Sequence, residues 1–306
     1  MESVLTGFAV IALAVFVGWL AGRTGVVGPE ARPILARLNF SVLAPFLLFS
    51  VLATADVGAL FSALLPVSAL AAVAMMLVFA LVSMLVWRRD LARTVVGSLA
   101  SGYVNGNNFG IPIAVYMLGD AAYSAPIVLL QLLLFAPVAL AILGARVEGR
   151  TSVWQIVRGT LTNPIIVGSL LGVAVAVSGV ELPPVVLEPI ELLGHAAVPL
   201  MLISFGLSLT GQRLLAAGTG RRDVLLASLL KLVVMPATAY LLGRFVFGLD
   251  ETALYAVTVL AALPTAQNVF NYAQRYETAE IVARDTVFIT TVGCLPVLLG
   301  LALLLG

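Results

Sequence analysis

The sequence has very few of the residues that build metal sites and covalent cross-links. It contains one cysteine, Cys294, and one histidine, His195, among 306 residues. A single cysteine cannot form a disulfide within the chain or build a cysteine-based metal site. A single histidine excludes metal motifs that need two. We therefore expect no bound metal and no cofactor.

Charge is also scarce in this chain. Only 10% of the residues are charged and 61% are hydrophobic, with a mean hydropathy of +1.13. Soluble domains carry about 25% charged residues, and a soluble core of this size could not bury so much apolar surface. The net charge of +1 indicates no attraction to nucleic acid. The composition predicts a protein that is embedded in membrane lipid.

The apolar residues fall in long continuous runs, which predict helices because lipid tolerates only helices and closed barrels. The run from Val4 to Ala21 is long enough to span a bilayer. It lacks the basic start and the cleavage site of a signal peptide, so we expect it to be the first span. Ten spans are predicted, at residues 4–22, 34–54, 60–87, 94–118, 122–144, 159–179, 188–209, 224–246, 252–273 and 281–304.

The arginines support this count of ten. With ten spans both termini lie on one side, and the loops of the other side hold fourteen arginines, whereas the terminal side holds only Arg244. Basic residues gather on the cytoplasmic side, so we expect a multi-pass protein of the cytoplasmic (inner) cell membrane with both termini outside. The fourteen are Arg23, Arg32, Arg37, Arg88, Arg89, Arg93, Arg146, Arg150, Arg158, Arg213, Arg221, Arg222, Arg275 and Arg284.

The two halves of the chain resemble each other. A shift of 154 residues lays LNFSVLAPFLLFS (38–50) over LLGHAAVPLMLIS (192–204), and it also superposes the predicted spans of the two halves. Each half has five spans, an odd number, so the second half enters the membrane upside down. The sequence predicts an all-α integral membrane protein of two inverted five-helix repeats, residues 1–148 and 149–306. Inverted repeats are common among secondary transporters.

The fourth predicted span contains residues that disturb a helix. It reads GYVNGNNFGIPIAVYMLGD (102–120), in which glycines loosen the helix and Pro112 removes a backbone donor. Three amide side chains lie at membrane depth in this span, those of Asn105, Asn107 and Asn108.

The ninth span has a similar break. It reads AALPTAQNVFNYAQRY (261–276), and the 154-residue shift places Gly110 over Pro264. The polar side chains that follow the proline are Thr265, Gln267, Asn268 and Asn271.

A break frees backbone N–H and C=O groups that lipid cannot satisfy. In secondary transporters such breaks meet near the midplane and bind the substrate, and half-helix N-termini suit a carboxylate. The competing interpretation is that these residues only kink and join helices, but two breaks in matched positions favour a site. The predicted substrate-binding residues are Asn105, Asn107, Asn108, Gly110, Pro112, Pro264, Thr265, Gln267 and Asn268.

Lys231 is a basic residue inside the eighth span, before Pro236. It can serve as a coupling or charge partner, paired with an anion or with a buried carboxylate. It can also extend its ammonium group to the cytoplasmic surface, as lysines near helix ends do. The sequence leaves both interpretations open.

These segments resemble the auxin efflux carrier family, which includes plant PIN-FORMED carriers and bacterial malonate carriers. The similar segments are LARLNFSVLAPFLLFSVLA and the FGIP of the fourth span, then NPIIVGSLLGV, LLGHAAVPLMLISFGLSL, KLVVMP and LPTAQNVFNYAQRYE. The last is the most specific, since the family pattern there has a proline, a small residue and an asparagine before an aromatic stretch. The likeness covers nearly the whole chain.

The resemblance implies a scaffold domain from the first two helices of each half and a transport domain from the other three. It also implies crossed broken helices four and nine, as in NhaA-like and bile-acid-symporter-like folds, and an elevator-type motion. Matched residue by residue, Asn108, Pro112, Pro264 and Asn268 correspond to the crossover residues. The long loop of the plant carriers is absent. The bile-acid symporters have an acidic residue beside the second break, where LPTAQN has none.

We therefore expect a secondary transporter of a small organic anion, auxin-like or malonate-like, and not an enzyme. Protons are a candidate coupling ion, beside the membrane potential and the substrate gradient, and a second copy of the chain is a candidate partner. The first alternative is a sodium-coupled symporter of the bile-acid type. The remote alternative is a membrane-embedded enzyme, against which the sequence offers a single histidine and no acidic pair inside a helix.

Overall fold

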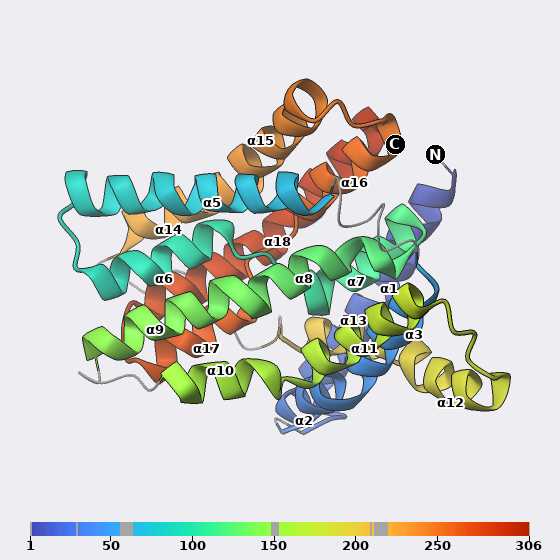
Figure 1. Cartoon of the computed structure of the whole chain (residues 1–306). Coiled ribbons are helices and arrows are strands. Elements are labelled where there is room, and N and C mark those ends of the chain that lie inside the picture. The colour runs from blue at the N-terminus through green and yellow to red at the C-terminus, as the bar shows by residue number, and fades with distance from the viewer. Residues whose placement is uncertain are drawn as a thin grey trace. The chain divides into compact units, whose positions relative to one another are not determined.

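The computed structural model describes residues 2–28, 30–55, 64–147, 153–208, 210 and 220–305. These residues are helical almost throughout, as Figure 1 shows, and they include no strand. The only extended pairing among them is an isolated antiparallel bridge between Val104 and Thr265. The prediction of an all-α protein is therefore confirmed for the part of the chain that is described.

Six helices in the described ranges are long and apolar enough to cross a membrane, so the chain is a multi-pass membrane protein. Three shorter apolar helices accompany them, and the count of ten spans stays a prediction. The fourth and ninth predicted spans are not among the six because a break divides each. The six are Pro33–Thr54, Leu65–Val86, Ala121–Ala145, Pro184–Ser204, Arg221–Val246 and Glu280–Leu305; the shorter three are Ala12–Thr24, Pro164–Ser178 and Glu251–Ala261.

The chain forms two compact units, each made of three separate segments. Unit 1 comprises Met1–Ser62, Asn107–Leu129 and Gly159–Gln212, and unit 2 comprises Ala63–Gly106, Leu130–Arg158 and Arg213–Gly306. Residues 107–129 group with unit 1 by their contacts, whereas the expected division placed them in the transport domain.

Unit 1 is built on two helix pairs, α1 with α13 and α3 with α11. Its helices and helical turns are α1 (Glu2–Thr24), α2 (Ala31–Leu38), η1 (Asn39–Leu43), α3 (Ala44–Thr54), η4 (Gly106–Gly110, whose first residue belongs to unit 2), α7 (Ile111–Ile113), η5 (Ala114–Leu118), η6 (Ala121–Ser124), α8 (Ala125–Leu130, whose last residue belongs to unit 2), α11 (Pro164–Ser178), α12 (Pro184–His195) and α13 (Ala197–Ser208).

Both pairs in unit 1 meet through glycines that touch a neighbouring backbone. A Cβ at Gly18 of α1 would collide with the carbonyl oxygen of Ile203, and a Cβ at Gly172 of α11 would lie 2.6 Å from that of Phe49. The two glycines, Gly18 and Gly172, are 154 residues apart, and so are the two residues that they touch, Phe49 and Ile203. One contact is therefore the repeat of the other, with the spacing found in the sequence.

Unit 2 holds the second broken span and the part of the first broken span up to Gly106. Its helices and helical turns are α5 (Leu65–Leu81), η3 (Val82–Val86), α6 (Leu91–Gly102), η7 (Gln131–Phe135), α9 (Ala136–Val147), α14 (Arg221–Leu229), η8 (Leu230–Val234), α15 (Met235–Leu241), η9 (Leu242–Val246), α16 (Glu251–Ala261), α17 (Gln267–Arg275) and α18 (Glu280–Leu305); α10 (Val153–Leu161) straddles the division. Figure 1 shows α5 and α6 side by side, and they are in contact.

Unit 2 also repeats itself, but with a different spacing. The turn before α6 is closed by a bond from Arg89 N to Ser83 O (2.9 Å), and the turn before α16 by one from Leu249 N to Gly243 O (2.9 Å). Both residues of the bond shift by 160, from 83 to 243 and from 89 to 249. The N-cap of the next helix is Asp90 in one case and Asp250 in the other, and its carboxylate accepts from a backbone N–H of the first turn.

Candidate substrate site at two broken helices

The two broken spans meet at a short stretch of extended backbone within unit 2. Asn105 N donates to Pro264 O (2.7 Å), and Ala266 N donates to Tyr103 O (3.0 Å), on either side of the Val104–Thr265 bridge. The two donors, Asn105 and Ala266, are 161 residues apart, and so are the two acceptors, Tyr103 and Pro264. The two breaks thus satisfy part of each other's freed backbone, which lipid cannot do.

The sequence explains why the second helix breaks here. Proline has no N–H and its ring clashes with the preceding turn, so α16 ends at Ala261, three residues before Pro264. The chain resumes as α17 at Gln267. Its N-cap, Ala266, has no side-chain oxygen that could accept from the first-turn N–H groups.

Thr265 links the crossing to neighbouring segments of unit 2 by two hydrogen bonds. It is fully buried; its hydroxyl donates to Ala100 O (2.6 Å), and its backbone N–H donates to the hydroxyl of Thr290 (3.0 Å). Both hydrogen-bond donors of this predicted site residue are therefore used within the protein. Gln267 and Asn268, in contrast, lie on the first turn of α17 and are partly exposed.

The remaining predicted residues come from the first break. Asn105 is 8% exposed and contributes its backbone to the crossing. Asn107 and Asn108 follow in η4, where the amide of Asn107 donates to that of Asn108 (3.0 Å). The positions of Gly110 and Pro112 are at the end of η4 and in α7, beyond the crossing.

The expected match between Gly110 and Pro264 is therefore wrong. The residue that corresponds to Pro264 at the crossing is Tyr103, seven residues earlier than Gly110. The 154-residue spacing holds for the contacts of unit 1 but grows to 160 and 161 in unit 2, so a single shift could not align both. Sequence analysis consequently missed Tyr103.

Lys231 lies on the same unit, wholly inside the protein. Its side chain is 0% exposed, so the interpretation that its ammonium group extends to the surface is wrong. Nζ donates to Ala261 O (2.6 Å) and contacts Met235 Sδ at 3.3 Å. Ala261 is the last residue of α16, where the helix dipole concentrates negative charge, and this favours a cation.

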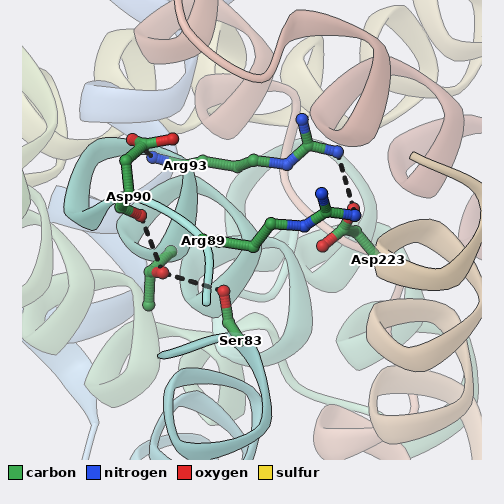
Figure 2. A network of polar contacts seen from close by, with 6 residues as sticks. Ser83, Arg89, Asp90, Arg93 and Asp223 are labelled. Carbon is green, nitrogen blue, oxygen red and sulfur yellow. Dashed lines mark hydrogen bonds and ion pairs between the residues drawn. The ribbon is translucent and has the colours of Figure 1, made fainter. Parts of the chain in front are cut away.

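A second polar group in unit 2 was missed by sequence analysis. Asp223, in the first turn of α14, is 0% exposed and accepts from Arg93 (2.6 Å) and Arg89 (3.2 Å). Figure 2 shows both guanidinium groups pointing at this carboxylate. We call these three residues the arginine–aspartate cluster. An acidic residue in the first turn of an apolar helix was the available signal.

Ser83 lies near this cluster in Figure 2, and its hydroxyl is 2.8 Å from the hydroxyl of Thr94. Two acidic side chains in the helices of unit 2 are buried, those of Asp223 and Asp285 (3% exposed). Asp285 pairs with Arg284 (2.8 Å). The described residues contain no group of three His, Cys, Asp or Glu side chains placed to hold a metal ion.

Apolar spanning helices and a crossing of two broken segments define a multi-pass helical membrane protein. Comparison with known sequences identifies its family: the chain belongs to the family described as "Membrane transport protein", whose model matches residues 3–150 and 148–302. This is the auxin efflux carrier family that the sequence motifs resembled.

The similar proteins are also transporters. The chain is 27% identical over 300 residues to a "Putative malonate transporter" of Rhizobium meliloti (strain 1021), covering 95% of this chain and 92% of the relative. It is 31% identical over 167 residues to a "Probable auxin efflux carrier component 5b" of Oryza sativa subsp. japonica, covering 51% and 44%. It is 26% identical over 198 residues to an "Uncharacterized transporter" of Methanocaldococcus jannaschii, covering 63% and 62%.

Proposed function

We propose that this protein is a secondary transporter of a small organic anion, a mono- or dicarboxylate, and that the substrate binds at the crossing. The observation that carries the proposal is the start of α17. Its N-cap gives no side-chain hydrogen bond, and its first turn carries the partly exposed amide of Asn268. A helix N-terminus has partial positive charge and free N–H donors, which together suit a carboxylate.

The names of two relatives favour the same class of substrate. One is named for malonate, a dicarboxylate, and another for auxin, which is a monocarboxylate. The relative named for malonate matches nearly the full length of both chains. We therefore take malonate as the first substrate to test.

We further propose that the chain consists of ten spans arranged as two inverted repeats. The repeated contacts support this arrangement: they recur after 154 residues in unit 1 and after 160 or 161 in unit 2. Unit 1 would be the scaffold and unit 2 the transport domain of an elevator-type carrier in the cytoplasmic membrane, with both termini outside. An accessible-cysteine test at Val186 and Arg222, in a Cys294→Ala background, checks the orientation, since only Val186 should label from outside intact cells.

The position of Lys231 bears on the driving force. In carriers with broken helices, C-terminal ends of half-helices coordinate the coupling cation. Here the ammonium group of Lys231 already lies at the end of α16. We therefore propose that transport does not require sodium, which disfavours a symporter of the bile-acid type. Protons and the membrane potential remain the candidate driving forces.

The test uses purified protein in proteoliposomes and radiolabelled malonate. Accumulation should be saturable and should not change when external sodium is replaced by choline. Asn268→Ala should weaken malonate affinity by roughly tenfold to a hundredfold, because a hydrogen bond to a charged group contributes about 1.5–3 kcal/mol. Asn271→Ala, on an exposed position of α17, is the matched control.

The result that contradicts the site is equal affinity in wild type and Asn268→Ala, with both proteins folded. Strict dependence of uptake on sodium would contradict the role given to Lys231 but leave the site standing. Failure of the wild type to take up malonate, succinate, propionate and indole-3-acetate would contradict the proposed function as a whole.

A further inference from the structure

Tyr103 presents a buried hydroxyl at the crossing that forms no hydrogen bond of good geometry within the protein. The residue is 2% exposed, and its hydroxyl oxygen has no hydrogen-bond partner of good geometry. It nevertheless lies close enough to interact with the side chains of Tyr272 and Asn268 on α17. A buried polar group left unpaired costs about 1–3 kcal/mol, so its retention calls for an explanation.

The surroundings of this hydroxyl are those of an anion subsite built from neutral donors. Asn268 lies on the first turn of α17, whose N-cap supplies no side-chain acceptor. Tyr272 is one turn further along, four residues on, and therefore on the same face of that helix. The hydroxyl of Tyr103 reaches this face from the end of α6, held there by the bond from Ala266 N to Tyr103 O (3.0 Å).

We propose that Tyr103 is a specificity-determining residue whose hydroxyl donates a hydrogen bond to a carboxylate of the substrate, beside Asn268 and the start of α17. This inference rests on the proposed function and adds a residue to its site. Tyr272 takes the neighbouring position, close enough to interact with the Tyr103 side chain. Without substrate the Tyr103 hydroxyl has no hydrogen-bond partner of good geometry, and the bound carboxylate supplies a well-placed acceptor.

The proposal predicts opposite signs for two measurements on one variant. Tyr103→Phe removes the hydroxyl and keeps the ring, so it also removes an unpaired buried group. The empty protein should therefore unfold at the same temperature as wild type or higher. Substrate should bind more weakly, because the carboxylate loses a donor. A residue that only supported the fold would show the reverse pattern.

Tyr255→Phe is the matched control. Tyr255 is in the first turns of α16, and its hydroxyl is also buried without a hydrogen-bond partner. It lies six residues before the end of α16, away from the break. Loss of this hydroxyl should leave substrate affinity unchanged while removing the same chemical group.

The experiment measures binding of radiolabelled malonate by scintillation proximity and thermal unfolding of the purified, detergent-solubilised proteins. If wild type shows no saturable malonate binding, succinate, propionate and indole-3-acetate follow in the same assay. We expect Tyr103→Phe to raise the Kd at least tenfold with no fall in the unfolding midpoint, and Tyr255→Phe to stay within twofold of wild type.

Two outcomes would overturn the assignment of Tyr103. One is a Kd for Tyr103→Phe within twofold of wild type. The other is a lower unfolding midpoint with unchanged affinity, which would make the residue structural. In both cases wild type still binds, so the proposed function survives. If wild type binds none of the four carboxylates, the proposed function fails, and this inference fails with it.

Discussion

Unit 2 contains two polar regions that treat buried hydrogen-bonding groups in different ways. The arginine–aspartate cluster gathers full charges and pairs them, with two guanidinium groups on the single carboxylate of Asp223. The crossing gathers neutral groups and leaves some of them open, among them the hydroxyl of Tyr103. Paired charges fix one arrangement of helices, whereas unpaired neutral donors can receive a ligand. The contrast separates residues that hold unit 2 together from residues that act on substrate.

The largest effect on stability should come from the cluster. Asp223→Ala leaves two arginines facing each other without their carboxylate, and breaking a buried ion pair by removing one partner costs on the order of 3 kcal/mol. We expect a fall of several degrees in the unfolding midpoint, measured by thermal shift in detergent. Malonate affinity of the protein that remains folded should change less than twofold. A large loss of affinity with normal stability would erase the distinction between the two regions.

Lys231 should show the opposite behaviour, because it is a charge at the end of the broken helix. Lys231→Gln removes the charge but keeps a donor that can reach the carbonyl oxygen of Ala261. We expect malonate transport to fall about tenfold, equivalent to about 1.4 kcal/mol, while the unfolding midpoint stays the same or rises, since burying a charge is costly. Rates of uptake in proteoliposomes measure this. Wild-type rates at every malonate concentration would remove Lys231 from the transport mechanism.

Thr265 tests the structural side of the crossing. Thr265→Val removes the hydroxyl that donates to Ala100 O while keeping the shape of the side chain. The expected cost is about 1 kcal/mol of stability, because a carbonyl oxygen loses its donor. Affinity should fall only modestly, through loosening of the break. Thermal unfolding and malonate binding on the same preparation measure both, and an affinity loss as large as that of Asn268→Ala would place Thr265 in direct contact with substrate.

The smallest effects should come from the two aspartates that cap α6 and α16. Asp90 accepts from Arg93 N (2.9 Å), and Asp250 accepts from Ala253 N (2.8 Å). Replacing either by Ala should cost about 1 kcal/mol. Because the two sites are equivalent by the 160-residue spacing, the two losses should agree within experimental error. Unequal losses in thermal unfolding would indicate that the two hairpins carry unequal shares of the stability of unit 2.

Sequence analysis predicted the features that depend on local chemistry. Long apolar runs predicted helices, and Pro264 marked a break that the structure places between Ala261 and Gln267. It could not predict which residues meet across the break, because Tyr103 reaches Asn268 only through folding of segments 165 residues apart. Asp223 was missed for a similar reason: its charge is compensated by arginines about 130 residues away.

The sequence likewise could not predict where the ammonium group of Lys231 lies. Its distance from the helix end allowed either a surface or a buried ammonium group, and only the packing around α14 and α18 removed the first choice. The sequence also could not predict which residues of the two halves are equivalent in unit 2. A spacing of 154 residues fitted the helix contacts of unit 1, but the corresponding contacts of unit 2 are 160 or 161 residues apart. A fixed shift of 154 therefore pointed to Gly110 in place of Tyr103.

The glycine contacts of unit 1 have a consequence for how its helix pairs respond to temperature and ligand. Where Gly172 meets Phe49 O and Gly18 meets Ile203 O, the seam is made of main chain, which has no rotamers. Close approach of this kind is how helices associate in lipid, where no hydrophobic force drives them together. Such a seam has no alternative packings of nearly equal energy to exchange between. Each helix pair should therefore move as one rigid body. Any rearrangement of the protein must then occur where side chains, rather than backbones, form the contact.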